Sequence, residues 1–187
     1  MMYSETISGS AALHSTPRNT GRHVPPFLCQ LYQCFGVAVL ATASYLLISH
    51  FVLQSVTIVG SSMVPTLYDS QRHLLNRWIY CFHAPKRGEI VVLRDPADNG
   101  FSVKRIIATA GDSISFDNGE VYVNGRRLKE PYLAPGTVTL SNSHFRNELI
   151  VCGKDHCFVL GDNRGNSVDS RSYGPVPIPN ILGLVIH

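Results

Sequence analysis

One long uncharged stretch constrains what this chain can fold into. No Asp, Glu, Lys or Arg occurs between Arg22 and Asp69, and within that stretch residues 35–53 read FGVAVLATASYLLISHFVL. This mostly apolar run approaches the ~20 residues that a helix needs to cross the hydrocarbon layer of a bilayer. The sequence therefore predicts a transmembrane helix over residues 35–53. Before it, residues 1–34 are expected to be a disordered segment because they are rich in Ser, Thr and Pro.

The basic residues predict the orientation of this helix. Arg18 and Arg22 precede it, and no further Lys or Arg follows until Arg72. By the positive-inside rule, the N-terminus then lies in the cytoplasm and residues 54–187 lie on the other side of the membrane. The triplet ATA at 41–43 has the small-x-small form of a signal-peptide cleavage site. The apolar run continues past it to residue 53, however, which favours a span over a cleaved signal peptide.

Composition narrows the class of protein further. The net charge of +3 is small and dispersed, with no basic run or zinc-finger spacing, so we expect no nucleic-acid partner. The five cysteines include no CxxC pair, which argues against a structural metal site. Cys152 and Cys157 flank a turn-like insert. They either form a disulfide in an oxidising compartment or remain free thiols, and the sequence leaves both open.

From Ser55 onward the residue pattern is almost wholly that of β-structure. Short apolar runs alternate with turns, and Asn-Gly dipeptides at 118–119 and 124–125 are strong hairpin signals. The sequence predicts a mainly β domain over residues 54–187, built on a mixed, largely antiparallel sheet. Strands are expected at 89–93, 101–107, 113–116 and 121–123, with a further hairpin of 148–151 and 157–160 and a loop-rich excursion over 129–146.

A short stretch of the predicted domain is rich in large apolar residues and has two interpretations. These residues are Trp78, Ile79, Tyr80 and Phe82. They either belong to the core of the domain or dip into the membrane interface, where Trp and Tyr concentrate. Core packing is the first expectation, and the interfacial interpretation stays open.

Three separate segments carry residues suited to catalysis. Taken alone, a loop serine, a strand lysine and a polar turn would each be ordinary. Their occurrence in this order behind a predicted membrane span is the informative feature. The segments are GSSMVPTL at residues 60–67, KRIIATAGD at 104–112 and GDNRGNSVDSR at 161–171.

This ordered set resembles the type I signal peptidases, membrane proteases that remove targeting peptides from translocated preproteins. That family has Ser-Met-x-Pro-Thr-Leu around its nucleophile, Lys-Arg and then Gly-Asp around its base, and Gly-Asp-Asn-x-x-x-Ser-x-Asp-Ser-Arg near its C-terminus. The resemblance runs from about residue 35 to residue 183. It implies a Ser–Lys dyad on a β-rich fold, with Ser62 as nucleophile, Lys104 as general base, and no metal or cofactor.

The residue types fit that chemistry. A serine hydroxyl is a weak nucleophile and needs a neighbouring base. Lysine serves as the base only when it is uncharged, and burial among apolar neighbours favours the neutral amine. Lys104 lies beside Val103, Ile106 and Ile107, so its predicted strand supplies such surroundings.

The resemblance also implies supporting roles. Ser167 matches the family serine that hydrogen-bonds and orients the lysine, and Asp169 with Arg171 matches the pair that fixes the loop near the site. Gly60 is a departure, since some members carry there a serine whose hydroxyl helps to stabilise the oxyanion. Backbone N–H groups, chiefly that of Ser62, are then expected to take that role.

The expected substrate is the end of a signal peptide, with small residues at the first and third positions before the cut. We expect it to bind as an added β-strand. The lipid bilayer is an expected partner, and the protein translocation machinery is a further candidate. The expected substrate-binding residues are Phe101, Ser102, Val103, Met63 and Pro65.

Other interpretations remain open beside this one. The predicted location is a bacterial plasma (inner) membrane, favoured by Arg164 and the Cys152–Cys157 pair. The alternative is the mitochondrial inner membrane, where a peptidase of the same family removes presequences. A membrane-tethered, catalytically inactive peptide-binding module is a third interpretation, and the intact Ser62 and Lys104 speak against it. A self-cleaving repressor is disfavoured because no DNA-binding domain is recognisable.

Overall fold

The computed structural model describes residues 26–141 and 148–187. The chain enters helix α1 (Pro26–Val52) nine residues before the predicted start of the span at Phe35. Proline suits the first turn of a helix, and the apolar residues that follow it continue the helical run. Residues 26–34, predicted to be disordered, are therefore helical, while residues 1–25 lie outside the described part. Within α1, Phe27–Leu47 is long and apolar enough to cross a membrane.

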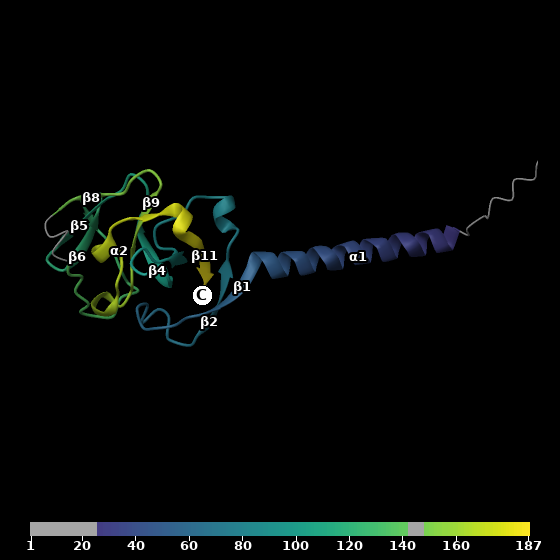
Figure 1. The fold of residues 1–187 in the computed structure, drawn as a ribbon, viewed down its shortest axis with the longest axis horizontal. Coiled ribbons are helices and arrows are strands. Elements are labelled where there is room, and N and C mark those ends of the chain that lie inside the picture. The colour runs from purple at the N-terminus through teal and green to yellow at the C-terminus, as the bar shows by residue number, and fades with distance from the viewer. Residues whose placement is uncertain (1–25, 142–147) are drawn as a thin grey trace, which may run out of the picture. The chain divides into compact units, whose positions relative to one another are not determined.

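The chain after α1 forms two sheets (Figure 1). The larger has seven strands in the order β1-β2-β11-β3-β4-β9-β10, and the smaller has four in the order β7-β6-β5-β8. Every strand pair in the described residues is antiparallel, which confirms the predicted mainly β, antiparallel class. The strands are β1 (Leu53–Thr57), β2 (Arg72–Asn76), β3 (Ile90–Arg94), β4 (Phe101–Ala108), β5 (Ser113–Asp117), β6 (Glu120–Val123), β7 (Arg126–Arg127), β8 (Ile150–Val151), β9 (His156–Leu160), β10 (Val176–Pro177) and β11 (Ile181–Ile186).

Short helical turns complete the described fold. They are the 3-10 helices η1 (Ile79–Cys81), η3 (Arg164–Asn166) and η4 (Ile178–Asn180), and the single-turn helix α2 (Ser170–Tyr173).

Both Asn-Gly dipeptides turn antiparallel strands, as predicted. Asn118 and Gly119 join β5 to β6 with φ angles of 48° and 81°, and Asn124 and Gly125 join β6 to β7 with 53° and 71°. Two successive residues with positive φ match the right-handed twist of the flanking strands. The Asn-Gly dipeptides were sufficient to predict these turns because the conformation of a turn depends mainly on its own residues.

The predicted hairpin of residues 148–151 with 157–160 is wrong. β8 pairs with β5 in the smaller sheet, and β9 pairs with β4 in the larger one. The backbone explains this separation, because the Cys152 N–H donates to the Asp112 carbonyl over 2.9 Å and the Gly111 N–H donates to the Cys152 carbonyl over 3.0 Å. These bonds hold the end of β8 against the start of β5, and the chain then crosses to the other sheet.

Cys152 and Cys157 are buried free thiols, which settles the alternative that the sequence left open. Burial raises the pKa of the Cys152 thiol to about 11 and that of the Cys157 thiol to about 12. Thiols this weakly acidic carry little thiolate and are poor nucleophiles. They pack as small apolar residues in the core.

The apolar core also fixes the loop that follows β1. Met63 and Leu67, each 1% exposed, pack in one cluster with Ile58 and Val92. Burying an apolar side chain of this size contributes about 1.5–3 kcal/mol. The two residues therefore anchor the loop on both sides of its turn.

The two Asn-Gly turns provide a matched test of the fold. Ala in place of either glycine meets about 1–2 kcal/mol of left-handed backbone strain. At Gly119 the new Cβ would also lie 2.5 Å from the Val138 side chain, whereas Gly125 faces open space. Gly119→Ala should therefore lower the midpoint of urea unfolding more than Gly125→Ala. Equal losses would show that the Val138 contact is unimportant.

Candidate active site

The first segment forms a tight turn after β1. The Val64 N–H donates to the Ser61 carbonyl over 3.2 Å, and the Leu67 N–H donates to the Met63 carbonyl over 3.0 Å. With Met63 buried beneath it, the turn leaves Ser62 half-buried. In the described part of the chain, neither the N–H nor the Oγ of Ser62 takes part in a hydrogen bond. Both groups remain available for chemistry.

Gly60 takes part in this turn through its backbone. It adopts a φ of +97°, which side chains rarely tolerate, and its N–H donates to Asp69 Oδ1 over 2.7 Å. This bond holds the pKa of the Asp69 carboxyl below its ordinary value. Because the Gly60 N–H is engaged, the free N–H of Ser62 is the donor that this turn offers to a developing oxyanion.

Lys104 lies in β4, opposite Val91 of β3, and only 4% of it is exposed. Burial lowers the pKa of its amine below the ordinary 10.5, because a charged ammonium loses solvation there. The carboxylates of Asp169 and Asp95 act in the opposite direction, and the effect of burial exceeds theirs. Lys104 is therefore neutral over a wider range of pH than a surface lysine.

Gly161 is the point at which the three segments meet. Arg105 pairs with Leu160 across β4 and β9, so the next step of that register brings Lys104 opposite Gly161. A Cβ on Gly161 would lie 2.6 Å from the Ser62 carbonyl oxygen and 2.6 Å from Ser167 Cβ. Only glycine fits such a close approach. The contact brings the strand that carries Lys104 next to the turn that carries Ser62.

Two asparagines that the sequence reasoning missed tie the third segment to this turn. The Asn163 N–H donates to the Ser62 carbonyl over 2.9 Å, and its side-chain amide donates to the Ser61 carbonyl over 3.1 Å. The Asn166 side-chain amide donates to Ser61 Oγ over 2.7 Å. Their presence inside the GDNRGNS motif was the available signal. These bonds tie the backbone of the Ser62 turn to the third segment.

Ser167 lies against Gly161, but its hydroxyl has no hydrogen-bond partner among the described residues. Within that part of the chain, no hydrogen bond joins the Ser167 hydroxyl to Lys104. None joins Lys104 Nζ to Ser62 Oγ among the same described residues. Leaving a buried hydroxyl unsatisfied costs about 1–3 kcal/mol. Unsatisfied polar groups of this kind are typical of functional sites, where hydrogen bonds often tighten only when a substrate is bound.

Asp169 and Arg171 form a buried, bidentate ion pair. Arg171 Nε donates to Asp169 Oδ1 and Arg171 Nη2 to Asp169 Oδ2, each over 2.8 Å. The Gly161 N–H donates to Asp169 Oδ2 over 3.0 Å, and Arg171 Nη2 also donates to the Arg164 carbonyl over 2.8 Å. The pair thus closes residues 161–171 into a loop whose start is fixed at Gly161.

A second buried ion pair, which the sequence reasoning did not assign, lies beside the first. Arg105 Nε and Nη2 donate to the two carboxylate oxygens of Asp162 over 2.9 and 2.7 Å. The Thr66 hydroxyl donates to the same carboxylate, and the Arg105 guanidinium lies 3.9 Å from the centre of the Tyr132 ring. Thr66 belongs to the first segment, Arg105 to the second and Asp162 to the third. The network therefore links all three.

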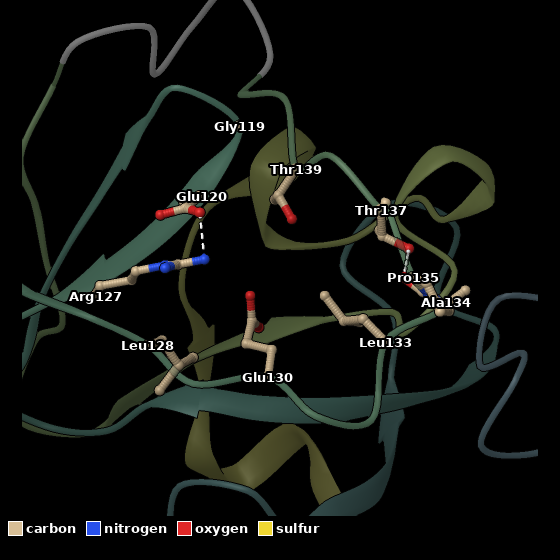
Figure 2. Close-up of a pocket in the computed structure, with 11 residues that line it drawn as sticks. Gly119, Glu120, Arg127, Leu128, Glu130, Leu133, Ala134, Pro135, Thr137 and Thr139 are labelled. Atoms are coloured by element: carbon tan, nitrogen blue, oxygen red, sulfur yellow. Dashed lines mark hydrogen bonds and ion pairs between the residues drawn. The ribbon is translucent and has the colours of Figure 1, made fainter.

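A third buried arginine ties the site to the excursion after β7. Arg164 Nη1 donates to Thr139 Oγ1 over 2.6 Å, and its guanidinium is paired with Glu130. Figure 2 shows Glu130 and Thr139 directed into a polar cavity of about 240 Å³, with the ion pair of Glu120 and Arg127 at its edge. Glu130 and Thr139 thus join the wall of this cavity to Arg164, and their bonds to it position the excursion.

The expected substrate-binding residues differ in accessibility. Phe101 is exposed, Ser102 and Val103 are half-buried, and Pro65 is half-buried beside Ser62. Met63 is buried in the core, so it supports the turn from below. Phe101 lines a groove of about 380 Å³ together with Val56, Leu75, Val92 and Leu182.

Among the described residues, no group of three or more His, Cys, Asp or Glu side chains is placed to hold a metal ion. The site offers a serine hydroxyl, a lysine amine with a lowered pKa, and a free backbone N–H. This combination can carry out acyl transfer.

The chain is similar to proteins of a known family. A family model described as "Signal peptidase, peptidase S26" matches residues 31–187. A signal peptidase I of Bacillus amyloliquefaciens is 35% identical over 144 residues, 72% of this chain and 72% of that protein. Signal peptidase I U of Bacillus subtilis (strain 168) is 42% identical over 125 residues, 62% of this chain and 63% of that protein. A solved signal peptidase I from Enterococcus faecalis V583 aligns at 27% identity with a TM-score of 0.47, covering 56% of this chain and 98% of that one.

The close approach at Gly161 predicts a sharp difference between two glycines of one loop. Gly161→Ala pushes the Ser62 backbone or Ser167 away, whereas Gly165→Ala enters open space. A displacement near 1 Å costs about 100-fold in rate. Gly161→Ala should therefore lose peptidase activity on that scale while Gly165→Ala stays near wild type. Near-normal turnover by folded Gly161→Ala protein would contradict this arrangement.

Proposed function

The chain belongs to the signal peptidase family S26 and is a peptidase that removes signal peptides; on that premise, we propose that it does so as a membrane-bound serine endopeptidase with a Ser62–Lys104 dyad. One observation carries the proposal. The glycine contact at residue 161 brings the turn of Ser62 next to the strand of Lys104, whose amine is buried.

The proposed reaction proceeds through an acyl-enzyme. The neutral amine of Lys104 takes the proton of Ser62 Oγ, which attacks the scissile carbonyl carbon. The Ser62 N–H donates to the oxyanion of the tetrahedral intermediate. The resulting Lys104 ammonium gives its proton to the leaving amine, and the neutral lysine then deprotonates a water that hydrolyses the ester.

The supporting residues act on the lysine and its loop. We assign to Ser167 the task of hydrogen-bonding the Lys104 amine once substrate fills the site. Its buried, unpartnered hydroxyl beside Gly161 supports this role. We assign to Asp169 and Arg171 the task of holding the loop, and their bidentate pair supports it.

The proposed substrate mode is strand addition beside Phe101, Ser102 and Val103. β4 is paired with β3 along these residues, but β9 pairs with it only from Arg105 onward in the described chain. The edge of residues 101–103 on the β9 side is therefore open to an extended peptide, whose backbone would supply the missing hydrogen bonds. We extend this mode to small residues before the cut, which is supported by the packing of Met63 and Val103 in one core cluster next to these segments.

The proposed location is a bacterial plasma membrane, with α1 as the span, the N-terminus in the cytoplasm and the peptidase domain outside. The apolar length of α1 and the arginines before it support this topology. The bacterial sources of the similar signal peptidases favour it over the mitochondrial alternative. The lipid bilayer and preproteins delivered by the translocation machinery are the proposed partners.

Removal of either member of the dyad tests the proposal. Ser62→Ala and Lys104→Met should each reduce cleavage of a labelled preprotein in detergent by about 10⁴-fold or more. The control is Lys154→Met, which changes an exposed lysine on a distant turn. Activity near wild type in either dyad variant, with the circular dichroism spectrum unchanged, would favour the inactive-module alternative or a different nucleophile.

The lowered pKa of Lys104 predicts the pH dependence of cleavage. Because the neutral amine is the base, kcat/KM should rise with pH through the lowered pKa of Lys104, below 10.5. The exposed carboxylate of Asp98 raises this pKa, so Asp98→Asn should lower it further and move the rising limb to lower pH. Asp117→Asn, which changes an exposed carboxylate of β5, serves as the control. A shift to higher pH, or the same shift in both variants, would contradict the assignment.

A further inference from the structure

A single stretch of the peptidase domain combines exposed aromatic residues with positive charge. Between Asp69 and Glu89 the sequence contains no acidic residue but four Lys or Arg, of which Arg87 is paired with Asp112. In the same stretch Trp78 is 48% exposed and Phe82 is 80% exposed. Large apolar side chains exposed together on a cationic surface are typical of a binding site for an anionic, partly apolar partner.

These side chains project from a rigid base. Asn76 Oδ1 accepts hydrogen bonds from the N–H groups of Trp78 and Ile79, each over 3.1 Å, and so caps the start of η1. Tyr80 packs into the core, and its hydroxyl donates to Glu89 Oε2 over 2.9 Å. The structure thus separates the four apolar residues, since Tyr80 and Ile79 are partly buried and Trp78 and Phe82 face outward.

The backbone behind the turn is equally fixed. A Cβ on Gly183 of β11 would lie 2.6 Å from the Asn76 carbonyl oxygen and 3.0 Å from Arg77 Cα. Only a glycine at position 183 of β11 lets the backbone of Asn76 and Arg77 approach this closely. Exposed aromatic side chains held on a rigid backbone are typical of a binding surface. A mobile loop that faces only water does not need such a backbone.

The register of the sheet places the turn beside the end of α1. Leu53, the first residue after the helix, pairs with Asn76 of β2. Paired strands lie about 5 Å apart, and each residue advances a strand by about 3.3 Å. Arg77 and Trp78 therefore follow within about 10 Å of the point where the chain leaves the helix. A helix that spans a bilayer brings this turn to the membrane surface.

We propose that the η1 turn is a second membrane contact, in which Trp78 and Phe82 insert into the interfacial layer of an anionic bilayer and Arg77 binds lipid phosphate. The proposal rests on the membrane span proposed for α1. Trp is favoured in this layer because its ring is apolar and its N–H bonds to headgroups. Basic side chains near the surface of an anionic leaflet add electrostatic attraction.

The contact has a consequence for cleavage. With α1 as its only attachment, the domain would be held at the bilayer at one point. A second contact on β2 holds the seven-stranded sheet, and with it the Ser62 turn, at a set height above the surface. Signal peptides that emerge from the same bilayer then meet the site in one orientation.

Tryptophan fluorescence tests this contact directly, because Trp78 is the only Trp in the chain. Full-length protein is reconstituted into vesicles containing anionic phospholipid, either plain or brominated near the top of the acyl chains. Flotation of the vesicles after a carbonate wash first establishes that α1 holds the protein in the bilayer, independently of the turn and of peptidase activity. Failure at this step would contradict the proposed span, whereas the quenching that follows tests the turn.

The proposal predicts that bromolipids quench the emission of Trp78 several-fold and that vesicles protect it from aqueous acrylamide relative to unfolded protein. Accessibility to acrylamide without bromolipid quenching would overturn it, because the ring would then face water. Protection from acrylamide without bromolipid quenching would also overturn it, in favour of a protein partner or a second copy of the chain.

A variant pair connects the contact to function. Phe82→Ser should lower cleavage of a membrane-inserted preprotein in vesicles several-fold and leave cleavage of a short soluble peptide in detergent unchanged. Leu149→Ser, which removes an apolar residue of 65% exposure outside the turn, should change neither rate. Equal loss in vesicles and detergent would indicate a folding defect at Phe82, and no loss in vesicles would contradict the proposed role in cleavage.

Discussion

The close approach at Gly161 is the contact on which the rest of the site depends. Main chain from the turn of Ser62 and the side chain of Ser167 both lie where a Cβ of residue 161 would stand. The strand register then brings Lys104 to the same point. Ser62 and Lys104, the proposed nucleophile and base, are 42 positions apart in the sequence, and the absence of a side chain at residue 161 lets their segments approach each other. Burial of the lysine follows from the same packing, since β3 pairs with β4 at Lys104 and the end of β9 pairs with β4 at the next residue, Arg105.

Buried charge gives this arrangement its geometry. The pairs Arg105–Asp162, Arg171–Asp169 and Arg164–Glu130 each join parts of the chain that meet only in the folded state. Buried ion pairs stabilise a fold little after desolvation is counted, but breaking one is strongly unfavourable. We infer that these pairs act chiefly to hold residues 161–171 in one conformation. Lys104 differs from the three arginines because no carboxylate bonds to it directly in the described chain, which leaves burial free to lower its pKa.

Local signals in the sequence predicted local structure well. Three features could be predicted because each depends on residues that are neighbours in the sequence. They are the Asn-Gly turns, the strand that carries Lys104 and the order of the three motifs. Pairings between distant segments could not be predicted. The chain crosses from β8 to β9 because Cys152 is hydrogen-bonded to the residues just before β5. The residues next to Cys152 in the sequence do not predict these bonds. The same is true of Arg164, whose partner Glu130 lies in the excursion after β7, and of Trp78, whose exposure depends on how Tyr80 packs.

The central claim is that the amine of Lys104 is uncharged at a pH where ordinary lysines are protonated. An NMR titration of full-length protein in detergent, labelled with ¹³C at lysine Cε, measures this directly. The chain has four lysines, and the signal that is absent from Lys104→Met protein identifies Lys104 among them. The account predicts that this signal titrates clearly below 10.5, the ordinary value for a lysine. A Lys104 signal that titrates at or above 10.5 would contradict it.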